Sequence, residues 1–140
     1  MSPSSLLFYL GINKELDIPH HALFFDTDFD KHAEEIYDKP QWPKNPLFYV
    51  SCTSKTDNSV APKGSEAVFI LVPVAPGLND NENSREIIFQ QIVKRLENVL
   101  GTNIKDYIVF KRSYAHKEFI SEFNSYKGNA YGLANTLFQT

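Results

Sequence analysis

The segment that most limits the possible folds is residues 67–74, Ala-Val-Phe-Ile-Leu-Val-Pro-Val, in which no side chain is charged. Successive side chains of a strand point to opposite faces of the sheet, so a strand with this sequence is apolar on both faces. Strands of this kind are typical of the middle of a sheet that is covered on both sides. We therefore expect residues 67–74 to form a central strand with both faces buried.

Four other segments have strand-like patterns bounded by turn residues, and they are residues 6–12, 21–25, 47–53 and 104–112. We expect the first two to lie in the central part of the sheet. A long polar loop separates residues 47–53 from residues 67–74, which suggests an antiparallel hairpin. In the last segment, Ile104, Ile108 and Phe110 are expected to share one face, opposite a more exposed face that includes Val109.

Three segments, residues 27–39, 84–100 and 116–123, have the apolar spacing of helices. Thr27 and Ser84 are the expected N-caps of the first two. The side chains expected to point inward are Phe29, Ala33, Ile36 and Tyr37, then Ile88, Ile92, Leu96 and Val99, then Phe119, Ile120 and Phe123. The pattern predicts a single α+β domain over residues 1–140, with a mixed, mainly antiparallel sheet of about five strands and helices packed on one face.

The composition excludes several classes of function. The 140 residues carry a net charge of −3 with no run of Lys or Arg, so we expect no nucleic acid as a partner. The single cysteine, Cys52, allows neither an internal disulfide nor a cysteine-based zinc site, and fits a reducing, cytoplasmic setting. No apolar stretch reaches the roughly 18 residues of a membrane span. A strand-like run begins soon after Met1, so we interpret Met1 as a start codon placed on a fragment.

No complete catalytic site is visible. The chain has no Gly-x-Gly-x-x-Gly motif for a dinucleotide and no Gly-x-Ser-x-Gly nucleophile motif. His20 and His21 are adjacent in a predicted strand and point to opposite faces, so they do not converge on a metal ion. We expect Cys52 to be a core thiol, and His32 and His116 to be solvated. Catalytic, cofactor-binding and metal-binding residues are therefore expected to be absent.

Aromatic residues are concentrated on the predicted strands: Phe8, Tyr9, Phe24, Phe25, Phe48, Tyr49 and Phe69. Each residue alone is well explained as ordinary core. Together, on strands that are apolar on both faces, they could also form the wall of a long apolar cavity suited to a lipid-like ligand.

Four stretches, in this order, resemble the phytoene desaturase (carotenoid dehydrogenase) family of amine-oxidase-type flavoproteins. They are Ser5-Leu-Leu-Phe-Tyr-Leu-Gly-Ile12 with residues 20–25, residues 49–64 with the segment Thr-Ser-Lys-Thr-Asp, residues 68–74, and residues 122–139 with Ala130-Tyr-Gly-Leu133. The resemblance covers nearly the whole chain. Asn58 stands where the family often has Pro, and Ala115-His116 where it often has Thr-Pro, which leaves the subfamily open.

The resemblance implies that a larger parent enzyme, an FAD-dependent oxidoreductase of carotenoid biosynthesis, removes hydrogen from a long polyene. It implies that residues 1–140 are the substrate-binding domain of this flavoenzyme, that the FAD-binding parts are absent, and that the fragment alone is inactive and binds no FAD. Two alternatives stay open: a stand-alone module that binds an apolar ligand or partner, and a fragment of a related retinol saturase or carotene isomerase.

The candidate substrate-binding residues are Phe8, Phe24, Tyr49, Phe69, Leu71 and Tyr131. Because the substrate is lipid-soluble, we expect the parent enzyme to contact a membrane surface, in the cytoplasm at the inner face of the membrane. We also expect self-association of the fragment through its bare apolar face.

Overall fold

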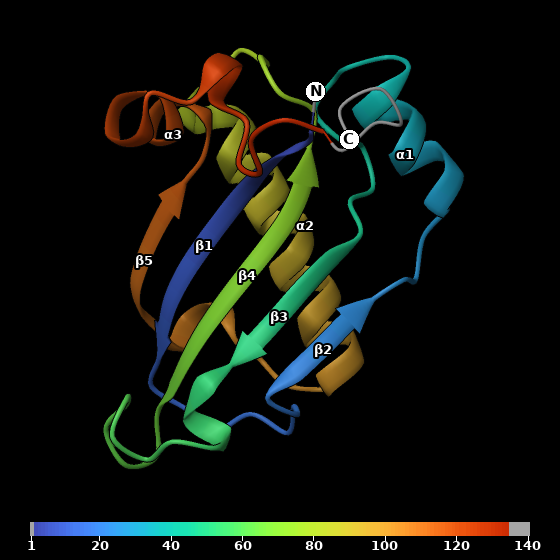
Figure 1. Ribbon diagram of the computed structural model, residues 1–140. Helices are drawn as coiled ribbons and strands as arrows, with labels where there is room; N and C mark the ends of the chain where they lie inside the picture. Colours follow the sequence, from blue (N-terminus) through green and yellow to red (C-terminus); the bar gives the residue numbers. More distant parts are fainter. Residues whose placement is uncertain (1, 135–140) are drawn as a thin grey trace.

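A five-stranded antiparallel sheet forms the centre of the protein, as the computed structural model shows for residues 2–134 (Figure 1). Its strands are β1 (Ser4–Ile12), β2 (His21–Phe24), β3 (Phe48–Cys52), β4 (Glu66–Val74) and β5 (Ile108–Tyr114). The helices are α1 (Phe29–Tyr37), α2 (Glu82–Leu100) and α3 (His116–Phe123). The strand order is β2-β3-β4-β1-β5, and all four neighbouring pairs are antiparallel. The predicted α+β class is confirmed.

The positions of the strands agree only in part with the prediction. β4 lies between β1 and β3, so the apolar run does form a central strand. β2 is at the edge and pairs only with β3, so its predicted central position is wrong. Its side chains alternate between exposed and half-buried, which is the pattern of a strand with one covered face and not of a fully buried one.

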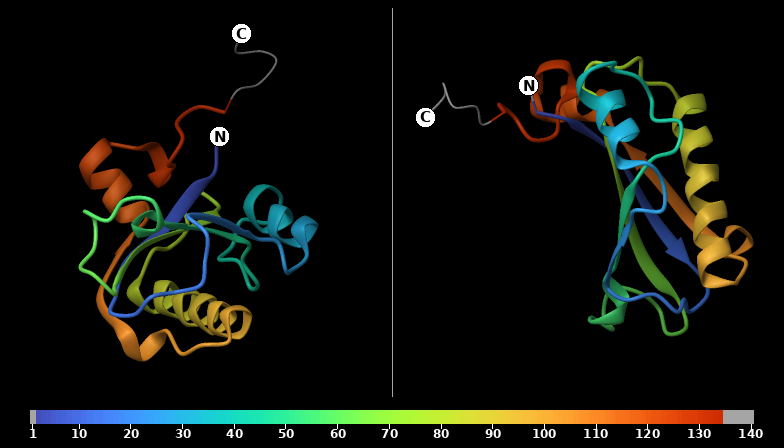
Figure 2. Two further views of the ribbon diagram at one scale, coloured as in Figure 1. Left: turned by 90° about the horizontal axis from the view of Figure 1, so that it is seen from below. Right: turned by 90° about the vertical axis from the view of Figure 1, so that its right-hand side faces the viewer.

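The two faces of the sheet differ, because α2 packs along only one of them (Figure 2). On β4, Val68, Ile70 and Val72 are buried against this helix face, whereas Phe69 and Leu71 on the other side are half-buried. The expectation that both faces of β4 are covered is therefore wrong for the described residues. We call the other side of the sheet the open face, and its principal side chains are Tyr9, Leu23, Tyr49, Phe69 and Leu71.

Helix α2 begins two residues before the expected N-cap, because the Asn81 side chain accepts a hydrogen bond from the Ser84 N–H (2.9 Å). It ends at Gly101, whose φ of 62° permits the left-handed C-cap. Its buried side chains are Arg85, Ile88, Phe89, Ile92, Val93 and Leu96. Val99 was expected in this stripe but is 62% exposed, because the stripe includes Phe89 and Val93 and turns away from Val99.

A β-bulge changes the side on which β5 presents its side chains. The register between β1 and β5 shifts between Gly11 and Ile12, so that Ile108 lies opposite Ile12 while Phe110 lies opposite Gly11. Phe110 consequently belongs to the open face and is 56% exposed. The prediction that Ile108 and Phe110 share a face is wrong.

Helices α1 and α3 lie at one end of the sheet (Figure 1). α1 begins after Asp28, not Thr27, because the Asp28 carboxylate accepts a hydrogen bond from the Lys31 N–H (3.1 Å). In α3, Phe119 packs edge-on against Tyr114, with ring centroids 5.0 Å apart. The other two residues of α3 that were expected to point inward, Ile120 and Phe123, are exposed, because this short helix contacts the rest of the protein only along a narrow stripe.

Candidate functional site

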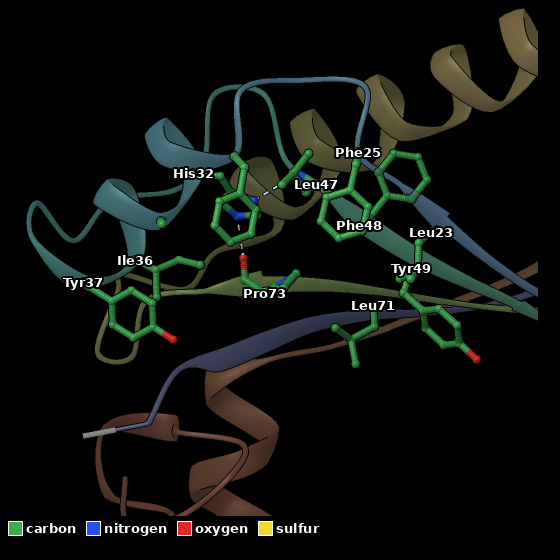
Figure 3. A pocket seen from close by; sticks show the side chains of 12 residues that line it. Leu23, Phe25, His32, Ile36, Tyr37, Leu47, Phe48, Tyr49, Leu71 and Pro73 are labelled. Atoms are coloured by element: carbon green, nitrogen blue, oxygen red, sulfur yellow. Dashed lines mark hydrogen bonds between the residues drawn. The ribbon is translucent and has the colours of Figure 1, made fainter. Parts of the chain in front are cut away.

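An apolar groove of about 330 Å³ lies where α1 meets the open face of the sheet (Figure 3). The residues that line it are Leu23, Phe25, Phe29, His32, Ala33, Ile36, Tyr37, Leu47, Phe48, Tyr49, Leu71 and Pro73. The helical wall follows from the spacing of the apolar residues of α1, which lie on one side of that helix. The groove is therefore built from a helix face and a sheet face that meet at an angle.

A row of side chains across three strands forms the sheet wall of the groove. Leu23 on β2 lies opposite Tyr49 on β3, and Tyr49 lies opposite Leu71 on β4. Residues that are opposite in this way point to the same side of the sheet, with Cβ atoms about 5 Å apart. The antiparallel register thus converts three residues that are distant in sequence into one continuous apolar surface.

His32 holds the helical wall of the groove in place. Its side chain is buried, with 3% exposed, and its Nε2 lies 2.9 Å from the Pro73 carbonyl oxygen while its Nδ1 accepts a hydrogen bond from the Leu47 N–H (3.1 Å). These two bonds require the neutral tautomer with the proton on Nε2. Burial lowers the pKa of His32, which favours the same neutral form.

The prediction that His32 and His116 are solvated is wrong. His116 is also buried, and its Nε2 lies 2.7 Å from the Ala75 carbonyl oxygen. A signal for His32 was present in the sequence, because it lies three residues after Phe29 and four before Ile36, on the apolar side of α1.

The open face continues beyond the groove as a row of aromatic rings. Tyr49 and Phe69 have ring centroids 6.4 Å apart, and Phe69 and Tyr9 follow at 5.3 Å. On the other side of Tyr49, its hydroxyl lies 2.6 Å from Nδ1 of His21 on the edge strand. The His21 ring in turn stacks on His20 at 4.0 Å. The prediction that these two side chains point to opposite faces is therefore wrong, because β2 begins only at His21 and His20 lies outside the strand. The surface is thus apolar in the middle and hydrogen-bonding at the β2 edge.

Three of the six candidate residues are brought together by the fold. Tyr49 and Leu71 line the groove, and Phe69 packs against Tyr49 on the same face. Tyr131 is not a lining residue and lies in the segment after α3, where its hydroxyl accepts a hydrogen bond from Ser5 Oγ (3.2 Å). Ser5 is the cross-strand neighbour of the lining residue Pro73. Their part in binding a substrate stays a prediction.

The other two candidates, Phe8 and Phe24, point to the helix face. Phe8 is 1% exposed and packs against Phe89 of α2, and Phe24 stacks on Phe48 at 4.5 Å. The sequence patterns placed Phe25 among the aromatic residues that could form a cavity wall. They predicted that Phe29 and Tyr37 point inward, which is wrong, because both are exposed and line the groove. A helical spacing shows that a helix has an apolar side, but it does not show that a groove is left beside it.

The groove contains few groups that could do acid–base chemistry. Among the lining residues, the side chain with a titratable nitrogen is that of His32. Both of its ring nitrogens already have hydrogen-bond partners. Behind the wall, the guanidinium of Arg95 lies over the Phe48 ring at 4.8 Å and is paired with Asp26, whose pKa it lowers. Among residues 2–134 there is no group of His, Cys, Asp and Glu that could hold a metal ion. The arrangement can bind and orient an apolar molecule, but it brings no catalytic set together.

Comparison with known proteins shows what the chain is similar to. No protein-family model matches the chain. The chain is 39% identical over 140 residues to carotenoid 3,4-desaturase of Haloarcula japonica, and 32% identical over 142 residues to 4,4'-diapolycopen-4-al dehydrogenase of Metabacillus indicus. It is 30% identical over 149 residues to the 4,4'-diapophytoene desaturase (4,4'-diaponeurosporene-forming) of Staphylococcus aureus. Each alignment covers 99% of this chain but only 28% or 29% of the relative.

Over nearly its whole length, this α+β chain is thus similar to one segment of proteins that are carotenoid or diapophytoene desaturases. It resembles the phytoene desaturase family, and it spans less than a third of the length of the curated relatives that it matches. The resemblance noted in the sequence is confirmed.

Members of this family are expected to use FAD, and the described residues do not fit the site for its pyrophosphate. The helix that follows the central strand is α2, and such a helix would present its N-terminal N–H groups to the phosphates. Here Asp80 and Asn81 occupy that end, and the Asp80 carboxylate is bonded to Arg85 (2.7 and 2.6 Å) and to the Lys117 N–H (3.0 Å). The Ser84 N–H at the same end already donates to the Asn81 side chain, so it is not free to bind a phosphate.

Proposed function

We propose that the chain is the substrate-binding part of an FAD-dependent carotenoid desaturase. In this proposal, part of a long polyene lies in the groove beside α1 and continues along the open face. The observation that carries the proposal is the convergence of exposed apolar side chains on one side of the sheet, including Leu23, Phe25 and Tyr37. Apolar surfaces of this kind usually mark a binding site.

Burial of apolar area supplies the affinity, because a polyene has almost no polar groups to bind. Each 100 Å² of apolar surface removed from water contributes about 2.5 kcal/mol before the entropy of binding is subtracted. The anchored wall at His32 would keep the groove open without the ligand, so that little ordering accompanies binding.

The redox step is proposed to depend on FAD held outside the described residues. Bound flavin would supply the hydride acceptor. This chain would hold the polyene in a fixed orientation and keep water away from it, and it would be inactive alone. A mixture of the chain, FAD and phytoene should therefore give no desaturated product by chromatography, and product formation would refute this part of the proposal.

Contact with a membrane surface is part of the same proposal, because a lipid-soluble substrate must be drawn from a bilayer. The parent enzyme would then lie in the cytoplasm, at the inner face of the membrane. No helix within residues 2–134 is long and apolar enough to cross a membrane. Co-sedimentation of the parent enzyme with liposomes tests the contact, and an entirely unbound fraction would contradict it.

Binding of lycopene to the chain tests the central claim. Lycopene presented in detergent micelles should co-elute with the wild-type chain. Leu71→Asp places a charge in the wall of the groove and should weaken binding at least about tenfold, since a carboxylate loses much of its hydration there. Val99→Asp, on the exposed side of α2, is the matched control and should bind as the wild type does. Equal binding by wild type and Leu71→Asp would refute the proposed site.

A further inference from the structure

The polar end of the groove is formed by two side chains, Tyr49 and His21. Tyr49 lines the groove beside Leu23 and Leu71, and its hydroxyl lies 2.6 Å from His21 Nδ1. Leu23 and His21 are two residues apart on β2 and point to the same side of the sheet. The Tyr49 side chain therefore starts in the apolar wall, and its hydroxyl meets His21 in the next row, at the β2 edge of the open face.

This pair can both donate and accept a further hydrogen bond, whichever atom carries the shared proton. If the Tyr49 hydroxyl donates to Nδ1, then His21 keeps an Nε2–H donor and the phenol oxygen can still accept. In the other tautomer Nδ1–H donates to the phenol oxygen, so the Tyr49 O–H is the donor and Nε2 is the acceptor. His21 is exposed, so a ligand can reach it. A hydroxyl or carbonyl group can thus be bound in either state.

Because the groove is small, the polarity of the end of a ligand is important for its binding. Its volume of about 330 Å³ is near the lower limit of the roughly 300–1,000 Å³ typical of ligand sites, so it would hold only part of a long polyene. The buried nitrogens of His32 already have partners. Figure 3 shows the Tyr37 and Tyr49 hydroxyls at opposite ends of the groove, and only that of Tyr49 is paired with a second polar side chain among the described residues.

We propose that Tyr49 and His21 determine specificity, by binding a hydroxyl or carbonyl group near the end of the polyene. The inference rests on the proposed function of the groove and adds a substrate class to it, namely polyenes with an oxygen-bearing end. A hydrocarbon end that covered the pair would remove water from its polar atoms without replacing the hydrogen bonds.

A matched pair of short polyenes tests the proposal on the 140-residue chain. All-trans-retinol has a terminal hydroxyl, and deoxyretinol has hydrogen in its place. Dissociation constants can be measured from the quenching of Trp42, the single tryptophan. The wild type should bind retinol more tightly than deoxyretinol by roughly three- to tenfold, the worth of one neutral hydrogen bond. Tyr49→Phe should abolish this ratio without weakening the binding of deoxyretinol.

Two controls separate the possible failures. Tyr37→Phe removes the hydroxyl at the other end of the groove and should keep the retinol preference. Leu71→Asp should weaken the binding of both ligands. If both ligands bind and Leu71→Asp weakens both, but Tyr49→Phe leaves the ratio unchanged, only the role of the pair is refuted. If neither ligand binds the wild type, or Leu71→Asp has no effect, the groove itself is refuted as a polyene site, and the role of the pair with it.

Discussion

Replacing His32 should loosen the wall of the groove, and the structure gives the magnitude. His32→Leu replaces the imidazole with an apolar side chain of similar size. Both hydrogen bonds of the buried ring are lost, so the Pro73 carbonyl and the Leu47 N–H are left without a partner. Each buried polar group without a partner costs about 1–3 kcal/mol. We therefore expect the free energy of unfolding to fall by about 2–5 kcal/mol at pH 7.

The pH dependence provides a second, independent readout. The folded state lowers the pKa of His32, so below the ordinary value of 6.5 the unfolded state binds more protons at this residue than the folded state does. Wild-type stability should fall as pH decreases from 7 to 5.5, with a slope from this residue of at most about 1.4 kcal/mol per pH unit. In this range the carboxylates with lowered pKa values, such as Asp80 and Glu118, stay ionised in both states and add no slope. His32→Leu should lack this contribution.

Urea unfolding followed by far-UV circular dichroism measures both effects. His32→Gln, which can keep a donor toward the Pro73 carbonyl, should lie between the wild type and His32→Leu. The reasoning would be refuted if His32→Leu were within about 0.5 kcal/mol of the wild type at pH 7, or if both proteins had the same pH dependence between 7 and 5.5.

Three further predictions concern other parts of the fold. Gly128→Ala should lower the free energy of unfolding by about 2–4 kcal/mol in urea. The φ angle of Gly128 is +63°, and an added Cβ atom would lie 2.7 Å from Cα of the buried His116. Stability near that of the wild type would contradict this packing. Arg85→Met should lower the free energy of unfolding by about 3–5 kcal/mol, since it leaves the buried Asp80 carboxylate without its partner. Adding Asp80→Asn should recover part of this loss. If nothing is recovered, the broken ion pair is not the cause of the loss. The bare open face should cause self-association that increases with concentration in light scattering and decreases when lycopene micelles are added, and a monodisperse monomer at all concentrations would argue against it.

The sequence was sufficient to predict the central strand and the α+β class, because a long uncharged run leaves few alternatives for residues 67–74. It was not sufficient to predict which faces are covered. The same alternation of apolar residues fits a buried face and an apolar face that is left open, so the half-buried state of Phe69 and Leu71 could not be read from the pattern.

Local irregularities account for the other differences. The β-bulge beside Gly11 moves Phe110 to the opposite side of the sheet, and no periodic pattern reveals a bulge in advance. Tyr49 and Leu71, which line the groove, were among the residues proposed from their place on strands rich in aromatic residues. The groove itself could not, because it depends on where α1 comes to rest beside the sheet.

The alternation along β4 gives this segment two nearly independent sets of positions. Val68, Ile70 and Val72 face α2, whereas Phe69 and Leu71 face away from it. Substitutions in the second set change the shape and polarity of an outer surface without creating a cavity in the interior. A scaffold organised in this way can acquire a new ligand preference in a few mutational steps and with little loss of folding stability.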